Sequence, residues 1–159
     1  SPLQPLSVAQ ALLRVIEQEQ PGLVILGKQA IDDDNSQVGQ MLAALWNRPQ
    51  ATFASKLVFE GESLTVTREV DAGLETIQID LPAVVTVDLR LNEPRFVKLP
   101  DIMKAKRKPL DTIALEELGV SSSADLEVTR YAAPPQRQKG IRVENAAQLV
   151  QELKNRGLL

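Results

Sequence analysis

The sequence predicts an α/β fold that combines a parallel, buried part of a sheet with an antiparallel meander. Two observations support this prediction. Short, continuously apolar runs at residues 23–26 and 83–87 are typical of strands buried on both faces of a parallel sheet. Between them, residues 53–81 alternate between apolar and polar side chains and are interrupted by short turn signals, which is typical of antiparallel strands.

The first elements predict half of a crossover unit. Ser7 followed by Gln10 fits a capping box, and apolar residues at helical spacing predict a helix over residues 7–18. Pro21 ends this helix, and the buried strand at residues 23–26 follows. Helix, turn and strand in this order indicate that the strand belongs to a parallel sheet.

A polar loop follows this strand and leads into a second helix. Asp34 or Asn35 is expected to cap that helix, which should run over residues 36–46. In an open α/β sheet, ligands bind at the carboxyl ends of the strands. The loop is therefore the first place to look for a binding site.

The rest of the chain predicts further strands and two more helices. Glu60-Gly61 and Asp71-Ala72-Gly73 separate the three strands of the meander, which are expected at residues 53–60, 64–70 and 74–81. Beyond the strand at residues 83–87, Pro100 begins and Pro109 stops a helix at residues 101–108. We then expect one helical turn at residues 115–119, a strand at 126–131 and an exposed connector at 133–140. A last helix should run over residues 145–156, with Asn145 and Gln148 forming its cap and Gly157 ending it.

The composition excludes several classes of function. The 159 residues contain no cysteine and no histidine, which removes disulfides, thiol nucleophiles, imidazole bases and most zinc sites. Aromatic residues make up only 3% of the chain, so the stacking surfaces of single-strand binders are scarce. No apolar run approaches the roughly 20 residues that span a bilayer. We expect one domain of a soluble, intracellular protein whose chemistry depends on carboxylates, lysines or a borrowed cofactor.

The loop at residues 27–39 has features of a phosphate site. It leads from a buried strand into a helix N-terminus, where backbone amides and the helix dipole favour an anion. Three consecutive aspartates, Asp32, Asp33 and Asp34, are unfavourable beside a phosphate unless they point away or hold a cation. The spacing matches neither a Walker loop nor the G-x-G-x-x-G motif. Three interpretations stay open: an acidic helix cap, a nucleotide site and a metal site.

Residues 88–108, DLRLNEPRFVKLPDIMKAKRK, combine charge with exposed apolar groups. Seven basic side chains oppose three acidic ones, so the stretch carries +4 in a chain whose formal net charge is −3. A solvated helix face and a nucleic-acid patch are two interpretations. Leu99, Ile102 and Met103 favour a third, because an apolar centre ringed by charge is typical of a protein interface. The basic side chains would then steer an acidic partner.

Several separate strings together resemble the β (small) subunit of electron-transfer flavoproteins. D-L-R-L-N-E-P-R at residues 88–95 and L-P-D-I-M-K-A-K at residues 99–106 match signatures of that family. A second block, G-K-Q-A-I-D-D-D, occupies residues 27–34, and shorter matches lie at residues 52–55, 73–76 and 134–137. Because the strings follow the family's order over nearly the whole chain, the sequence is identified as similar to this family.

The resemblance implies a fold and a role. The fold would be part of a Rossmann-like, adenine-nucleotide-binding parallel sheet of the HUP type, with an antiparallel meander and a C-terminal arm. The chain would form a heterodimer with a larger α subunit that holds most of the FAD, while the chain itself binds AMP. The flavin would take electrons from acyl-CoA and related dehydrogenases and pass them to a membrane quinone oxidoreductase. The chain would thus be an electron-carrier subunit without catalytic or metal-binding residues, in the bacterial cytoplasm or the mitochondrial matrix.

The resemblance also assigns roles to residues. Glu69 is implied to contact the flavin domain, and Leu99 to be the hydrophobic anchor that enters a pocket on the dehydrogenase. The docking residues beside this anchor are Pro100, Ile102, Met103, Lys104, Lys106 and Arg107. The AMP loop comprises Gly27, Lys28, Gln29, Ala30, Ile31, Asp32, Asp33, Asp34, Asn35, Ser36, Gln37 and Val38. Among these, the main contacts are expected from Ala30, Asp33, Ser36, Gln37 and Val38.

Three regions follow from the resemblance. They are a nucleotide-binding core over residues 1–89, a recognition loop with a short basic helix over residues 90–112, and a strand, connector and helix over residues 113–159 that pack on the α subunit. The resemblance further implies roughly a hundred residues before Ser1, about the length of a small domain. The core would then be incomplete at its N-terminus.

Departures from the family pattern leave alternatives open. Members that bind AMP usually have Asn-Gln-Thr where this chain has Ser36-Gln37-Val38, so one hydroxyl contact to the phosphate is missing. Backbone amides would still hold a phosphate there. The string Gln-Val-Gly is similar to that of electron-bifurcating relatives, which carry a second FAD in place of AMP. An adenine-nucleotide-binding sensor and a basic nucleic-acid-binding module are the remaining alternatives.

Overall fold

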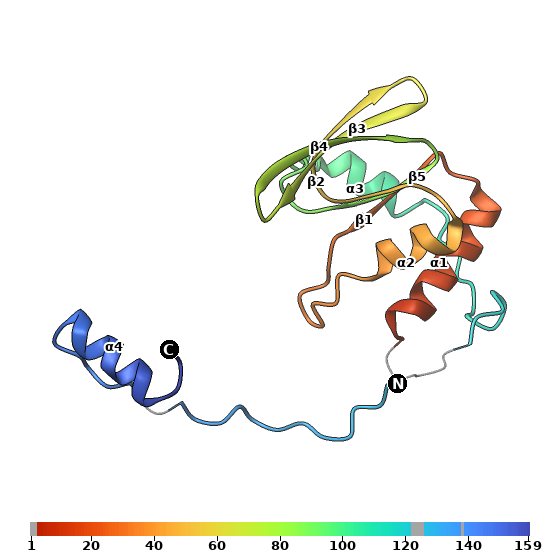
Figure 1. Ribbon diagram of the computed structural model, residues 1–159. Coiled ribbons are helices and arrows are strands. Elements are labelled where there is room, and N and C mark those ends of the chain that lie inside the picture. Colours follow the sequence, from red (N-terminus) through yellow and green to blue (C-terminus); the bar gives the residue numbers. More distant parts are fainter. Residues whose placement is uncertain (1–2, 122–125, 138) are drawn as a thin grey trace. The chain divides into compact units, whose positions relative to one another are not determined.

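A five-stranded mixed sheet with two helices packed on one face forms the centre of the computed structural model (Figure 1). The structure describes residues 3–121, 126–137 and 139–159. The strand order is β1-β5-β2-β3-β4. The chain divides into two compact units, Ser1–Asp125 and Leu126–Leu159, and the sheet lies in the first. Parallel strands, antiparallel strands and helices together confirm the predicted α/β class, consistent with a Rossmann-like fold.

The parallel part of the sheet consists of three strands. β1 (Leu23–Gly27) pairs with β5 (Ala83–Val87), and β5 pairs with β2 (Gln50–Glu60). The prediction for β5 is confirmed, because Ala83, Val84, Val85 and Thr86 are all buried. The prediction that β1 is buried on both faces is wrong. β1 lies at the edge of the sheet in this chain. Val24 and Leu26 pack against the helices, so Ile25 points to the opposite face, where the core cluster contains no residue of α1 or α2, and it is 49% exposed.

The predicted meander is confirmed. β2, β3 (Ser63–Val70) and β4 (Gly73–Asp80) form consecutive antiparallel pairs. The apolar side chains of β3 alternate as a half-buried strand requires, so Leu64 and Val66 are fully buried. They pack with Ala51, Ala54 and Val85 in a core cluster.

Helices α1 (Pro5–Glu19) and α2 (Val38–Trp46) bury a second cluster of apolar side chains against the sheet. Ala9, Ile16, Leu42 and Ala43 pack there with Val84. The predicted cap at Ser7 is wrong, because α1 begins two residues earlier and Gln4 occupies the cap position without a side-chain bond. Pro at the first helical position starts the helix, since its fixed φ suits that position.

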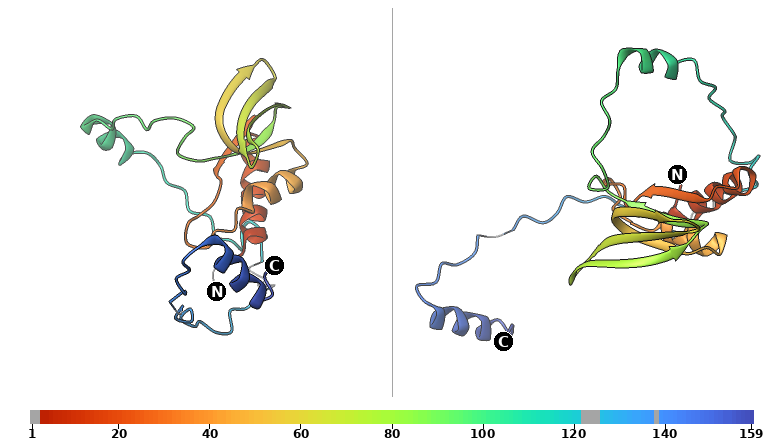
Figure 2. Two further views of the ribbon diagram at one scale, coloured as in Figure 1. Left: turned by 60° about the vertical axis from the view of Figure 1, so that its left-hand side comes forward. Right: turned by 90° about the horizontal axis from the view of Figure 1, so that it is seen from above.

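Residues 88–121 leave the end of β5 and return beside α1 (Figure 2). This excursion contains the short helix α3 (Leu99–Ala105), which begins two residues before the predicted start and ends three before the predicted end. Residues 115–119 form consecutive hydrogen-bonded turns, as the predicted helical turn requires: Leu118 N–H donates to Ala114 O at 3.4 Å and Gly119 N–H to Glu116 O at 3.0 Å. Val120 is buried, and Ser7 Oγ donates to Ser121 O at 3.4 Å.

The second unit contains helix α4 (Ala146–Asn155). Its predicted cap is confirmed, since the Asn145 side chain accepts from Gln148 N–H at 2.9 Å, and Gly157 follows the helix with φ +67°. The predicted strand at residues 126–131 is wrong. A strand needs a neighbour to complete its backbone hydrogen bonds, and the described part of this unit contains no other strand. Within the described residues of the chain, no helix is long and apolar enough to cross a membrane.

Candidate functional site

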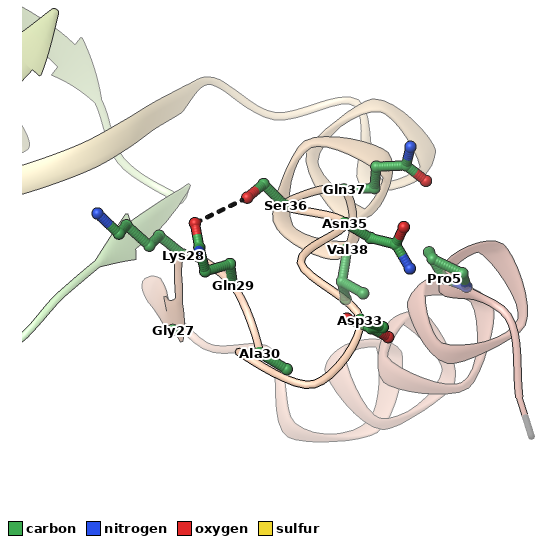
Figure 3. A pocket seen from close by; sticks show the side chains of 10 residues that line it. All are labelled: Pro5, Gly27, Lys28, Gln29, Ala30, Asp33, Asn35, Ser36, Gln37 and Val38. Carbon is green, nitrogen blue, oxygen red and sulfur yellow. Dashed lines mark hydrogen bonds between the residues drawn. The ribbon is translucent and has the colours of Figure 1, made fainter. Parts of the chain in front are cut away.

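A cavity of about 280 Å³ lies where β1 leads into α2 (Figure 3). Nine of the twelve residues predicted to form the AMP loop line it, and Ile31, Asp32 and Asp34 do not. The tenth lining residue, Pro5, was missed from the sequence. Its position follows from the fold, because a helix that precedes a strand in a crossover unit runs back along it and begins near the carboxyl end of that strand.

Polar side chains within the loop hold its shape. The Gln29 amide donates to Asp34 Oδ1 through Nε2 and accepts from Ser36 Oγ at 3.2 Å through Oε1. Asp34 N–H donates to Ala30 O at 2.9 Å. Asp34 and Ser36 both have left-handed backbone conformations, with φ of 56° and 52°. Asp34 is thus held off the cavity lining. Asp32 does not line the cavity either, and Asp33 does.

The start of α2 opens on this cavity without a side-chain cap. Neither Asp34 nor Asn35 caps the helix, so that prediction is wrong; Gln37 is the cap residue, and its side chain makes no capping bond. The left-handed turn at Ser36 delays the helix to Val38, which moves the expected cap out of position. The first amides of a helix lack carbonyl partners within the helix. The amides that follow Gln37 are therefore available to an anion in the cavity.

Gly39 brings the start of α2 unusually close to β5. A Cβ atom at this position would lie 2.3 Å from the Thr86 Cγ2 atom, and Thr86 is only 1% exposed. Thr86 Oγ1 also accepts from Phe53 N–H at 3.1 Å, at a β-bulge where Phe53 has φ of 60°. Thr86 therefore joins the helix start to β2 as well. No signal in the sequence showed the contact between Gly39 and Thr86, because it depends on how α2 packs on β5.

Four ionised side chains form a charged junction beside the cavity: Lys28, Glu69, Asp88 and Arg90. Lys28 Nζ lies 3.2 Å from Asp88 Oδ2. Arg90 Nη2 lies 2.5 Å from Asp88 Oδ2 and 2.5 Å from Glu69 Oε2. In Figure 3 the Lys28 side chain turns away from the rest of the cavity lining, and its ammonium also lies 5.7 Å from the centre of the Phe53 ring. The junction joins the segments after β1 and β5 to the end of β3.

The Arg90 guanidinium keeps both carboxylates of the charged junction ionised. Its hydrogen bonds hold the pKa of Asp88 well below its ordinary value of 3.8 and lower the pKa of Glu69 below 4.5. The two carboxylates raise the pKa of Arg90 in turn. Carboxyl groups with lowered pKa values stabilise the folded state above their ordinary pKa, and this contribution is lost as the pH falls through the folded-state values. Both carboxylates of the junction are therefore ionised at neutral pH.

The predicted docking residues lie together on and just after α3, away from the cavity residues. All seven are exposed: Leu99, Pro100, Ile102, Met103, Lys104, Lys106 and Arg107. Leu99, the first residue of the helix, is 71% exposed, while Ile102 and Met103 are 41% and 48% exposed. The structure thus brings the apolar and basic groups to one short element.

No cluster of three or more potential metal ligands occurs among the residues that the structure describes. The aspartates of the loop lie in sequence, but Asp34 is engaged by Gln29 and Asp32 does not line the cavity. Backbone amides, polar side chains and one carboxylate, that of Asp33, remain as the groups that line the cavity. The amides and polar side chains suit an anionic or nucleotide ligand better than a bare cation.

Comparison with known proteins gives the family. A family described as "Electron transfer flavoprotein domain" matches residues 2–118. The chain is 56% identical over 153 residues to the electron transfer flavoprotein subunit beta of Bradyrhizobium diazoefficiens, which covers 96% of this chain and 61% of that protein. It is 55% identical over 154 residues to the mitochondrial electron transfer flavoprotein subunit beta of Oryza sativa subsp. japonica. That match covers 97% of this chain and 61% of the rice protein.

The Homo sapiens subunit beta is 52% identical over 155 residues, covering 98% of this chain and 61% of the human protein. The chain thus spans about 61% of the length of these relatives. The match includes the cavity loop, the charged junction and α3, which all lie within residues 2–118. The chain therefore belongs to the electron transfer flavoprotein family, and its relatives there are β subunits.

Proposed function

We propose that this chain acts as the nucleotide-holding and partner-docking part of an electron transfer flavoprotein β subunit. In this role it binds AMP in the cavity between β1 and α2 and assembles with an α subunit that carries FAD. FAD supplies the redox chemistry, by accepting electrons from acyl-CoA and related dehydrogenases and passing them to a quinone oxidoreductase. The chain itself is a carrier subunit, in the bacterial cytoplasm or the mitochondrial matrix. The single observation that best supports the proposal is the cavity lined by the predicted AMP loop.

The size and chemistry of the cavity fit a mononucleotide. Small-molecule sites usually measure roughly 300–1,000 Å³, and the cavity of about 280 Å³ is close to the small end of that range, as a mononucleotide site would be. The uncapped amides at the start of α2 would hold the phosphate. Gln37 and Val38 stand at that helix start, and neither needs a hydroxyl for this contact, since the donors are backbone groups. The missing threonine hydroxyl therefore does not argue against AMP.

The docking role rests on the exposure of α3. Leu99 stands at the start of the helix with most of its side chain in solvent, and Lys104 and Lys106 follow on the same short element. An exposed apolar side chain surrounded by charge is favourable for binding a partner and has no packing role within the chain. We propose that Leu99 enters a pocket on the dehydrogenase while the lysines steer its approach.

The surface that meets the α subunit includes α4. This helix has no buried residue among those described, although Leu149 and Val150 are apolar and 46% and 43% exposed. An amphipathic helix with no buried residue in its own chain is typical of a helix that packs on a second protein chain. Glu69, held at the charged junction, is the proposed contact to the flavin domain.

Mass spectrometry of nucleotides released from the denatured, full-length protein tests the ligand. We expect AMP, and we expect Ala30→Glu to reduce its content, because Ala30 lines the cavity. Ile31→Glu is the matched control, since Ile31 is 95% exposed and does not line the cavity. A second equivalent of FAD in place of AMP would favour the bifurcating relatives. Absence of any nucleotide or flavin, or equal loss in both variants, would contradict the proposal.

A further inference from the structure

The charged junction lies at the root of the recognition loop, residues 90–112. Arg90 is the first residue of that loop, and its guanidinium bridges Asp88 after β5 and Glu69 on β3. Its Nε also donates to both Asp88 carboxylate oxygens at 3.1 Å, and its backbone N–H donates to Asp88 Oδ1 at 2.9 Å. A single side chain thus ties the loop to two strands of the sheet.

Beyond its root, the recognition loop has few ties to the rest of the chain. Residues 92–113 are all exposed, and among the described residues their hydrogen bonds are internal to this stretch. The chain next packs at residues 115–121, where Val120 is buried and Ser121 O accepts from Ser7. The position of α3 therefore depends on two points of attachment, one at Arg90 and one beside α1.

The chemistry of Arg90 suits the first attachment point. A planar guanidinium presents several N–H donors at fixed angles and can bond two carboxylates at once, whereas a lysine ammonium acts as a point charge. The side chain of Asp88 is only 11% exposed, and Lys28 adds a second cation to it at 3.2 Å. Isolated surface ion pairs contribute little, but a network with this geometry holds its members in one arrangement.

We propose that Arg90 is a positioning residue for partner docking: by bridging Asp88 and Glu69 it sets the direction in which the recognition loop leaves the sheet and so presents Leu99. The inference deepens the proposed function, on which the docking role of Leu99 rests. Lys28, which also lines the cavity, shares Asp88 with Arg90, so the root of the loop and the ligand cavity have one carboxylate in common.

Distance measurements between two spin labels test the inference without any partner enzyme. The chain has no cysteine, so labels can be placed at Phe59→Cys on β2 and Lys108→Cys after α3, both at exposed positions. The distance between the labels is measured in the full-length β subunit assembled with the α subunit. The signal from protein without the two substitutions is subtracted. Arg90→Gln should raise the fraction of molecules outside the wild-type distance peak by up to about fivefold. Glu69→Gln should give a smaller rise, and Arg90→Lys an intermediate one.

Arg95→Gln is the matched control, because Arg95 lies in the same loop and makes no ion pair or hydrogen bond within the described parts of the chain. Its distance distribution should equal the wild type. A distribution for Arg90→Gln that coincides with that of the control would overturn the inference. If circular dichroism shows that Arg90→Gln does not fold, Glu69→Gln decides, and an unchanged distribution there overturns it. Because the measured distance reports neither nucleotide content nor electron transfer, failure of the proposed function would show separately, in nucleotide content and electron-transfer rates.

Discussion

At the scale of single residues, Gly39 connects packing with the ligand cavity. The first turn of α2 can approach β5 only because residue 39 lacks a Cβ atom, which would stand 2.3 Å from the Thr86 methyl group. Thr86 is buried and bonded to Phe53 N–H, so it has little room to move away. The position of the uncapped amides at the cavity therefore depends on this close contact.

Replacing Gly39 with alanine should destabilise the protein by about 1–3 kcal/mol, because the added methyl group overpacks a buried contact. Chemical denaturation would measure this free energy of unfolding, and nucleotide content should fall with it. Thr86→Ser removes the clashing methyl but keeps the hydroxyl, so the double variant should regain most of the loss. Gly22→Ala serves as control, since nothing lies within 4 Å of a Cβ atom there. Full stability of Gly39→Ala alone would show that the contact does not constrain α2.

At the scale of elements, the sequence predicted those whose signals are local. The alternation in β3 and β4, the apolar run of β5 and the cap and glycine of α4 are properties of neighbouring residues, and these predictions are confirmed. The predictions that were wrong concern features that depend on contacts between residues far apart in the sequence. The edge position of β1 depends on strand order, and residues 126–131 lack a strand to pair with in their unit.

The candidate site shows the same division. The loop between β1 and α2 was predictable, because a polar loop after an apolar strand marks the ligand edge of a sheet. Pro5, the Gly39–Thr86 contact and the bridge from Arg90 to Glu69 join residues that are far apart in the sequence. Residue types and spacing alone do not show such contacts.

The basic side chains of α3 and its end lead to a prediction about association rates. Lys106→Glu should slow association with the dehydrogenase by several-fold at low salt, because it replaces an attractive charge at the end of α3 with a repulsive one. Stopped-flow measurements at several ionic strengths would show the difference shrinking as salt screens it. Lys56→Glu on β2 makes the same change of charge at another exposed position and should have a smaller effect. Equal effects of both variants would indicate a response to net charge alone.

At the scale of the whole first unit, three features share the carboxyl edge of the parallel strands. The cavity follows β1, the root of the recognition loop follows β5, and the charged junction joins both to β3. Ligands bind at this edge in open α/β sheets. The same edge would thus hold the nucleotide and orient the docking helix, while the sheet and its two helices provide the rigid support.

The most direct test of docking through α3 uses the assembled protein with Leu99→Ala. The quantity measured is the rate at which a dehydrogenase reduces its flavin. We predict that the concentration of dehydrogenase needed for half-maximal rate rises by at least about tenfold, as expected for loss of an interface anchor. The flavin spectrum and the AMP content should stay unchanged. Leu74→Ala, at a side chain on β4 that is 73% exposed against 71% for Leu99, should leave the rate as it is. Unaltered reduction by Leu99→Ala, with Leu74→Ala equal to it, would contradict the central claim that this chain docks its partner through α3.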